Sequence, residues 1–372
     1  MKNNEKIAIF LPSFLGGGVE KMMVYLANNF SERGFTVDYV VIKNYGPYKE
    51  LLSEKVNLID LNKKRVITSI FALASYLRKN KPDVLLTAMN YVNIVAYIAN
   101  KLSLTNTKLV VSERAIPSKR LERNLKALVF KKTLSHVYSK SSQVIAISND
   151  VKTDLINNFK VKSQGITVVH NMVDLKNIRL INNDKKLQLY NKYFNQDENI
   201  PPIIIAAGRL VEYKNFSYLI DAFYLLSKSN LKVKLIILGE GGERARLEKQ
   251  IETYNLENRI KLPGFVTNPN DFYQISSLFV STSKHEGFGN VIAEAMALGL
   301  PIIVSDCKGG PKEIVGYGKY GDIVPLNDVN LLALKITTKI TEKYDASISV
   351  NRSKDFGVDK ISQQYLQVLL DE

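Results

Sequence analysis

The chain has few of the residues that build covalent or metal-bound frameworks. It holds one cysteine, Cys307, and three histidines among its 372 residues. A single cysteine excludes a disulfide framework and a cysteine-rich zinc site, and it is typical of proteins that work in a reducing cytoplasm. No stretch approaches 18 apolar residues, and the short apolar segment 7–11 stops at Pro12. We therefore expect neither a signal peptide nor a membrane-spanning helix.

Acidic residues are scarce in the first half of the chain. Residues 1–170 contain 26 Lys and Arg against 12 Asp and Glu, whereas residues 171–372 contain 25 against 24. Nearly all of the net charge of +15 therefore belongs to the first half. A basic half can face nucleic acid, anionic lipid or a lipid-linked diphosphate. No basic motif interleaved with aromatic side chains is present, so nucleic-acid binding is the less favoured of these alternatives.

The length and the hydrophobic pattern predict two α/β domains. Roughly 100 to 200 residues make one domain, so 372 residues suffice for two. Buried-strand signals at 6–11, 36–42, 84–87, 108–112 and 143–148 alternate with helical signals, and the alternation restarts at 203–207. This pattern predicts a parallel sheet wrapped by helices in each half.

A glycine-rich turn at 283–290 is the most informative stretch. An apolar strand signal at 278–280 precedes it, and a helical pattern starts at Val291. Gly287 and Gly289 would let the backbone approach a ligand closely. The free N–H groups of Asn290 and Val291, at the positive end of a helix dipole, would then attract an anion.

Two carboxylates, Glu286 and Glu294, flank this turn. They would repel a bare phosphate, so we expect them to bind hydroxyl groups on either side of it. A nucleotide-sugar has this layout, because a ribose and a hexose flank its diphosphate. The alternative is an ordinary strand-to-helix turn with two solvated glutamates.

The Glu-x7-Glu pattern with EGFG inside it resembles the signature of the retaining family 4 glycosyltransferases. That family has the GT-B fold, with two Rossmann-like domains facing an interdomain cleft. The resemblance implies that Glu286 contacts the donor sugar and that Glu294 holds the ribose hydroxyls. The amides of Asn290 and Val291 would contact the diphosphate. The donor-binding residues implied within this stretch are Glu286, Gly287, Phe288, Gly289, Asn290, Val291 and Glu294.

Further landmarks of the family follow in the expected order. Arg209 and Lys214 match its G-R-x4-K motif, where two cations past a buried strand would neutralise the departing diphosphate. Gly17 and Gly18 resemble the glycines that bring the first domain against that diphosphate; the alternative is that they are simple turn glycines. Residues 262–266 resemble the segment that lies against the base, which implies base contacts from Gly264 and Phe265. The stretch 170–174 resembles the family's H-N-G-V-D link, with methionine at 172 in place of glycine.

The acceptor side is less clearly marked. Glu113 and Arg114 follow the strand at 108–112, so they are candidate acceptor or transition-state contacts, although a charge pair in a loop is more often structural. Many relatives have a histidine in the cleft of this domain. None of His136, His170 and His285 matches it, so we assign no acid–base role to a histidine.

Residues 119–140 carry seven basic side chains and one acid. Leu121, Leu125, Leu128 and Val129 recur among them at helical spacing. One interpretation is a surface helix whose apolar stripe packs in the core. The other, which the charge asymmetry favours, is a helix on an anionic membrane surface, where each basic residue contributes about 1 kcal/mol. The predicted membrane or acceptor contacts are Arg114, Lys119, Arg120, Arg123, Lys126, Lys131 and Lys132.

The sequence thus predicts an acceptor-side domain over 1–170 plus 356–372 and a donor-binding domain over 171–355. The predicted catalytic residues are Glu286, Arg209, Lys214 and Glu113. No Asp-x-Asp occurs, in agreement with a GT-B enzyme that stabilises the leaving diphosphate without a metal; we expect no cofactor besides the nucleotide-sugar.

The resemblance is strongest to bacterial enzymes that extend polyprenyl-diphosphate-linked oligosaccharides. It implies a UDP-sugar donor, N-acetylhexosamine such as GalNAc ahead of hexose, and a lipid-linked saccharide acceptor at the inner face of the cytoplasmic membrane. The alternatives are a glycosyltransferase acting on lipopolysaccharide core or a diacylglycerol glycolipid, a catalytically silent GT-B scaffold, and a nucleic-acid-binding protein.

Overall fold

A computed structural model describes residues 5–15, 17–119, 124–176, 178–194, 200–229, 231–266 and 268–370. The chain divides into two compact units. Unit 1 comprises Met1–Met172 and Val358–Glu372, and unit 2 comprises Val173–Gly357. The boundaries predicted from the sequence, 170/171 and 355/356, each lie two residues from those of the structure.

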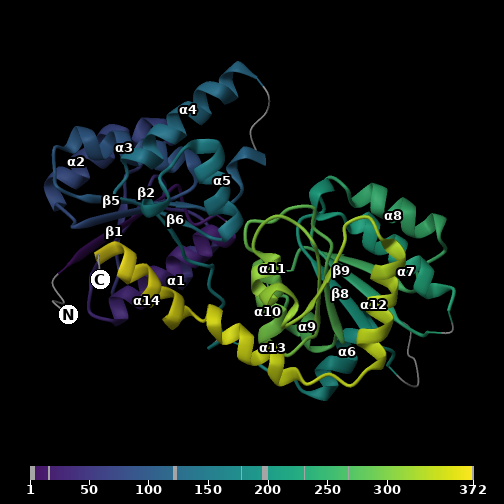
Figure 1. The fold of residues 1–372 in the computed structure, drawn as a ribbon. Helices are drawn as coiled ribbons and strands as arrows, with labels where there is room; N and C mark the ends of the chain where they lie inside the picture. Colours follow the sequence, from purple (N-terminus) through teal and green to yellow (C-terminus); the bar gives the residue numbers. More distant parts are fainter. Residues whose placement is uncertain are drawn as a thin grey trace. The chain divides into compact units, whose positions relative to one another are not determined.

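Unit 1 is built on a seven-stranded sheet in the order β3-β2-β1-β4-β5-β6-β7, and its neighbouring strands pair in parallel. The strands are β1 (Lys6–Leu11), β2 (Thr36–Val41), β3 (Asn57–Asp60), β4 (Val84–Ala88), β5 (Lys108–Glu113), β6 (Gln143–Ala146) and β7 (Ile166–Val168). Helices α1 (Gly18–Glu32) and α14 (Val358–Leu370) lie on one face, and α2 (Ile70–Asn80), α3 (Asn90–Ser103) and α4 (Leu125–Lys140) lie on the other (Figure 1). Helix α5 (Asn149–Phe159) follows β6.

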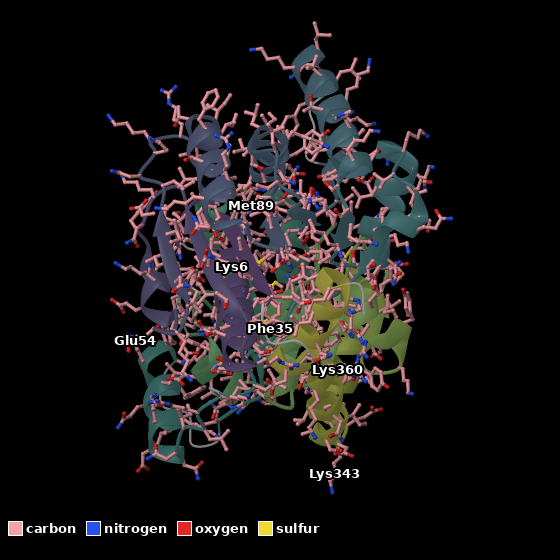
Figure 2. The ribbon with its side chains drawn as sticks, turned by 90° about the vertical axis from the view of Figure 1, so that its left-hand side faces the viewer. Lys6, Phe35, Glu54, Met89, Lys343 and Lys360 are labelled. Atoms are coloured by element: carbon pink, nitrogen blue, oxygen red, sulfur yellow. The ribbon has the colours of Figure 1, made fainter. Side chains whose placement is uncertain are left out.

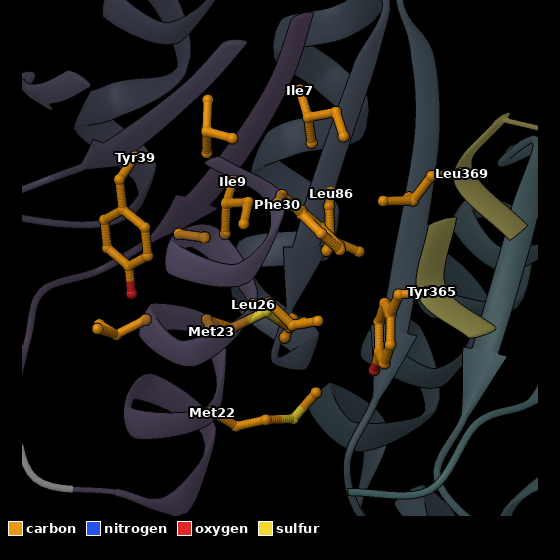
Figure 3. Packing of buried hydrophobic residues seen from close by; sticks show 14 of the residues in the cluster. Ile7, Ile9, Met22, Met23, Leu26, Phe30, Tyr39, Leu86, Tyr365 and Leu369 are labelled. Atoms are coloured by element: carbon orange, nitrogen blue, oxygen red, sulfur yellow. The ribbon is translucent and has the colours of Figure 1, made fainter. Parts of the chain in front are cut away.

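The last helix of the chain completes the core of unit 1. Tyr365 and Leu369 of α14 pack into the same cluster as Ile7 of β1 and Phe30 of α1, and all four side chains are buried (Figure 3). Helix α14 repeats apolar residues at spacings of three and four, which gives it one apolar face for this contact. Residues 358–370, within the range 356–372 that the sequence prediction placed with the first domain, thus form a helix whose buried side chains belong to the core of unit 1.

Unit 2 has a six-stranded sheet in the order β10-β9-β8-β11-β12-β13, and its neighbouring strands are again parallel. The strands are β8 (Ile203–Ala207), β9 (Lys234–Leu238), β10 (Ile260–Gly264), β11 (Leu278–Ser281), β12 (Ile302–Ser305) and β13 (Asp322–Val324). Helices α7 (Phe216–Ser227), α8 (Arg244–Thr253) and α12 (Val329–Thr341) cover one face. The other carries α9 (Asn270–Gln274), α10 (Asn290–Ala297), α11 (Pro311–Ile314) and α13 (Ala346–Ser353) (Figure 1). Helix α6 (Asn183–Tyr193) precedes β8.

The predicted fold class, two Rossmann-like domains with parallel sheets, is confirmed. In parallel sheets the loops that follow the carboxyl ends of the strands gather at one edge, which is where open α/β sheets bind ligands. The loops after β8, β11 and β12 therefore share an edge of unit 2, and those after β1, β4 and β5 share an edge of unit 1. Within the described ranges, no helix is both long enough and apolar enough to cross a bilayer.

Candidate active site

The turn between β11 and α10 is shaped by glycine at its end. Gly289, the residue before α10, has φ of 104°, a left-handed conformation that glycine adopts without steric cost. Its carbonyl accepts a hydrogen bond from the N–H of Ile292 at 2.9 Å, which starts the helix. The side chain of Phe288 is buried and contacts the ring of Phe356 with centroids 5.3 Å apart. The turn is thus anchored by Phe288, and the first residues of α10 follow it directly.

A second glycine-containing loop, which follows β12, forms backbone hydrogen bonds with this turn. The N–H of Glu286 donates to the carbonyl of Lys308 at 3.0 Å, and the N–H of Gly310 donates to the carbonyl of Gly287 at 3.1 Å. Gly309 has φ of 117°, and a Cβ at this position would lie 1.6 Å from the carbonyl oxygen of Glu286. Only glycine fits there, so the position of Glu286 depends on the loop at 308–310.

The structure brings Lys214 and Glu286 together. The ammonium of Lys214 donates to Oε2 of Glu286, and Oγ of Ser283 lies 3.4 Å from the same oxygen. The two side chains are only 12% and 18% exposed, so water screens the pair weakly. Oγ1 of Thr282 donates to the carbonyl of Lys214 at 3.1 Å and fixes the backbone that carries the lysine. The predicted diphosphate and sugar contacts are therefore direct neighbours.

Arg209 follows β8 and is exposed. Its Nη2 donates to the hydroxyl of Tyr213 at 2.8 Å. The ring of Tyr213 stacks on the ring of His285, with centroids 4.7 Å apart and an angle of 18° between the planes. Neither ring was among the site residues predicted from the sequence. The available signal was position, because Tyr213 lies within the G-R-x4-K spacer and His285 directly precedes Glu286.

Three further predicted donor contacts, Glu294, Gly264 and Phe265, lie on unit 2 as well. Glu294 is half-buried on α10. The burial of Tyr273, and to a smaller extent the charge of Glu294, raise the pKa of the Tyr273 hydroxyl well above its usual value. Gly264 ends β10, and its carbonyl accepts from the N–H of Gly239 at 2.8 Å. The side chain of Phe265 is exposed just beyond that strand, as a side chain that stacks on a ligand would be.

In unit 1 the predicted glycines begin α1. Gly17 is the residue before the helix and Gly18 is its first residue. A Cβ on Gly17 would lie 2.5 Å from Oε2 of Glu20, so the carboxyl group of Glu20 covers the backbone of Gly17. Burial raises the pKa of Glu20 above its usual value.

The carboxylate of Glu113 is buried inside unit 1, with a relative exposure of 2%. The hydroxyl of Tyr138 donates to its Oε2 at 2.5 Å, and the N–H groups of Arg114 and Ala115 donate to its Oε1 at 3.0 and 3.2 Å. Burial, and then the charge of Glu113, raise the pKa of Tyr138 well above its usual value. These contacts hold the end of β5 against α4, and they give no support to the acceptor or catalytic role predicted for Glu113.

The guanidinium of Arg114 is also engaged within unit 1. It donates to Oδ1 of Asn171 at 2.6 Å and to the hydroxyl of Tyr365 at 2.8 Å. Arg114 therefore joins the end of β5 to α14 and to the segment that leads out of unit 1. This geometry does not support the membrane or acceptor contact predicted for Arg114. Strand β5 ends at Glu113, and the guanidinium of Arg114 is directed toward Asn171 and Tyr365 within unit 1.

Helix α4 buries side chains in its second half, and in its first half Phe130 contacts the ring of Tyr91 with centroids 5.0 Å apart. Leu134, Val137 and Tyr138 are buried, whereas Leu125, Leu128 and Val129 in its first turns are exposed. The first turns stand clear of the rest of unit 1, and side chains project from them on all sides (Figure 2). The interpretation in which this apolar stripe packs in the core is therefore wrong for these three residues. Lys119, Lys126 and Lys132 are exposed nearby in sequence and Lys131 is half-buried; Arg120, Arg123 and Leu121 lie outside the described residues.

Two family models cover most of the chain. Residues 16–177 match the model described as Glycosyltransferase Family 4, and residues 191–355 match the model described as Glycosyl transferases group 1. The two matches fall on the two units of the structure, and the second contains Arg209, Lys214, Glu286 and Glu294. The chain belongs to the family 4 glycosyltransferases.

Curated relatives of this glycosyltransferase match along nearly its whole length. It is 28% identical to the N-acetylgalactosamine-N,N'-diacetylbacillosaminyl-diphospho-undecaprenol 4-alpha-N-acetylgalactosaminyltransferase of Campylobacter jejuni, over 98% of this chain and 100% of the relative. It is 24% identical to the amylovoran biosynthesis glycosyltransferase AmsD of Erwinia amylovora, over 95% of this chain and 96% of the relative.

Solved structures confirm the fold. A glycosyltransferase from Rickettsia africae superposes with a TM-score of 0.83 at 21% identity, over 99% of this chain and 98% of that one. HepE from Anabaena, solved in complex with UDP, superposes with a TM-score of 0.79 at 23% identity, over 99% and 100% of the two chains. The predicted GT-B fold of the glycosyltransferase is thereby confirmed.

Proposed function

We propose that this glycosyltransferase moves an N-acetylhexosamine, with GalNAc favoured, from a UDP-sugar to a lipid-linked saccharide. The product would serve bacterial surface polysaccharide, O-antigen or protein glycan assembly. The observation that carries the proposal is the ion pair of Lys214 and Glu286 beside the first turn of α10. The Campylobacter relative, whose name specifies N-acetylgalactosamine transfer to a diphospho-undecaprenol-linked sugar, supports the choice of sugar and acceptor.

In this proposal unit 2 binds the donor. The N–H groups of Asn290 and Val291 at the start of α10 bind the diphosphate, as helix N-termini bind anions. Arg209 and Lys214 add two positive charges to the same group. Glu286 binds hydroxyls of the sugar and Glu294 those of the ribose. Gly264 and Phe265 contact the base, and the backbone of Gly17 and Gly18 is proposed to bind the diphosphate as well.

The proposed reaction needs no metal and retains the anomeric configuration. The bond between the anomeric carbon and the diphosphate oxygen breaks, and a bond from the acceptor oxygen to the same carbon forms on the same face. The departing phosphate oxygen takes the proton of the acceptor hydroxyl. Charge builds up on the leaving diphosphate, where Arg209, Lys214 and the α10 amides stabilise it most.

We further propose that the protein works at the inner face of the cytoplasmic membrane, with α4 on the anionic surface. Exposed Leu125, Leu128 and Val129 provide apolar area, and the lysines of residues 119–132 provide charge. This would bring the basic unit to the lipid-linked acceptor.

The test is a transfer assay with a panel of UDP-sugars, in EDTA, on an undecaprenyl-diphosphate-linked saccharide. We expect one UDP-N-acetylhexosamine to give product with an axial anomeric linkage by NMR, and Glu286→Ala to abolish it. Product from a lipopolysaccharide core or a diacylglycerol glycolipid alone would replace the acceptor assigned here. Loss of activity in EDTA, restored by a divalent cation, would refute the metal-independent reaction. Absence of transfer and of UDP release with every donor would favour a silent scaffold.

A further inference from the structure

Two loops of unit 2 that carry the proposed donor contacts are joined side by side. The first loop, residues 208–215, holds Arg209 and Lys214, and the second, residues 282–289, holds Glu286. The N–H of Lys284 donates to the carbonyl of Tyr213 at 2.7 Å. The ammonium of Lys284 also lies 3.0 Å from Oε1 of Glu212. The loops are therefore connected through Lys284 as well as through the Lys214–Glu286 pair.

Tyr213 lies at the centre of this connection. Its ring rests on the ring of His285, which belongs to the second loop, while its hydroxyl accepts the hydrogen bond from Arg209 of the first. Stacked rings contribute about 0.5–1.5 kcal/mol beyond their buried area, which is enough to favour one ring orientation. The hydroxyl that meets Arg209 is therefore held at a defined place.

Arg209 needs such a partner because it is exposed. An arginine side chain loses up to about 2 kcal/mol of rotamer entropy when it is fixed. If Arg209 is already fixed by Tyr213, less of that entropy is lost when a diphosphate binds. Pre-organisation of this kind raises affinity without adding any contact to the ligand.

We propose that Tyr213 is a positioning residue for Arg209, and that His285 is the platform that orients Tyr213. Tyr213 does not touch the donor in this account; it acts through the guanidinium. The inference rests on the proposed function, since it assumes that Arg209 binds the donor diphosphate. Tyr213, which precedes Lys214, and His285, which precedes Glu286, would thus act together to orient Arg209.

The test measures the affinity of UDP for the full chain by isothermal titration calorimetry. Tyr213→Phe keeps the ring and removes the hydroxyl, and we expect it to weaken UDP binding about fivefold, the value of one hydrogen bond. His285→Ala should weaken binding by a similar factor, and His285→Phe, which restores a flat ring, should recover most of it. In the Arg209→Ala background, Tyr213→Phe should have no further effect, because the two residues act as one unit.

The matched control is Tyr254→Phe. The hydroxyl of Tyr254 donates to Oδ1 of Asp221 at 2.8 Å, and its ring stacks on Tyr224 with centroids 4.2 Å apart, so this variant removes the hydroxyl of another stacked tyrosine in the same unit and keeps its ring. This variant should bind UDP as wild type does.

Two results would overturn the inference, and they separate it from the proposed function. If Arg209→Ala weakens UDP binding and Tyr213→Phe does not, only the positioning role is wrong. If Arg209→Ala binds UDP as tightly as wild type, the diphosphate contact itself is wrong, and the positioning role falls with it. Equal effects of Tyr213→Phe in the wild-type and Arg209→Ala backgrounds would likewise refute action through Arg209.

Discussion

The ammonium of Lys214 is bound to the carboxylate of Glu286, a residue 72 positions later in the chain. The pair neutralises both charges before a donor arrives. A diphosphate that binds beside α10 would compete with Glu286 for the ammonium of Lys214. The carboxylate of Glu286 would then be released from Lys214 and could accept hydrogen bonds from the sugar. If the proposed donor contacts are right, the ion pair would thus link binding of the diphosphate to binding of the sugar.

Lys214→Ala removes the cation and leaves Glu286 in a poorly hydrated place. We expect sugar transfer to fall by about 10- to 150-fold, because a charge-assisted hydrogen bond contributes about 1.5–3 kcal/mol. The measurement is kcat/KM for the UDP-sugar. Lys185→Ala serves as the control, since Lys185 is exposed and pairs with Asp271 away from the loops that hold Lys214 and Glu286. Equal losses in the two variants would speak against a specific role of Lys214.

Gly309→Ala should disturb the site through the backbone. Its Cβ would lie 1.6 Å from the carbonyl oxygen of Glu286, in a residue with φ of 117°. We expect a loss of more than about 1 kcal/mol of stability, which corresponds to a fall in Tm of about 2–4 °C for each kcal/mol. Transfer activity should fall further than stability explains. Gly242→Ala is the control, because its Cβ would meet no atom within 4 Å. A Gly309→Ala protein with wild-type Tm and activity would contradict the close packing described.

The stability of the protein should fall in mild alkali partly through Cys307. Burial raises the pKa of its thiol to about 12, whereas an unfolded thiol titrates near 8.5. Above pH 8.5 the unfolded state releases this proton and the folded state keeps it, so unfolding becomes more favourable as pH rises. Between pH 8 and pH 10 wild type should lose about 2 kcal/mol more than Cys307→Ala. Urea unfolding at both pH values measures the difference, and equal losses would show that the thiol ionises in the folded protein.

Binding to anionic vesicles should depend on the exposed first turns of α4. Leu128→Ser removes an apolar side chain that is 62% exposed, and we expect the partition coefficient to fall about 10- to 150-fold if that side chain enters the bilayer, where its burial contributes about 1.5–3 kcal/mol. Leu334→Ser on α12 is matched in exposure, at 60%, and should have no effect. Sedimentation with phosphatidylglycerol vesicles measures both. Wild-type protein that stays in the supernatant would refute the membrane role of α4.

The architecture could be predicted from the sequence because the inner strands of parallel sheets are apolar throughout. Strand β8 begins and ends at the predicted residues for this reason. Among the strands that the sequence pattern did not predict, β3 and β13 are edge strands of three or four residues that begin or end with aspartate or asparagine. One solvated side leaves such strands without a long apolar run.

The pairing of side chains was less predictable than the backbone. Lys214 and Glu286 were expected on the same ligand, but nothing in the sequence indicates that they bind each other. The surroundings of Glu113 and Arg114 were also not predictable. Their position after a strand indicated side chains that face a cleft, whereas both are hydrogen-bonded inside unit 1. Exposure of Leu125, Leu128 and Val129 also depends on which half of α4 finds a partner, which periodicity alone cannot tell.

The membership of α14 in unit 1 has a consequence for synthesis. Val173 and Gly357 form a parallel bridge, so unit 2 is an insertion whose entry and exit lie together. A ribosome delivers residues 173–357 before it delivers the helix that carries Tyr365 and Leu369. Unit 2 can therefore fold first. Until α14 is made, the apolar surface of unit 1 that this helix covers stays exposed to solvent. A nascent chain stalled before residue 358 would lack this helix and leave that apolar surface exposed, as incompletely made domains do.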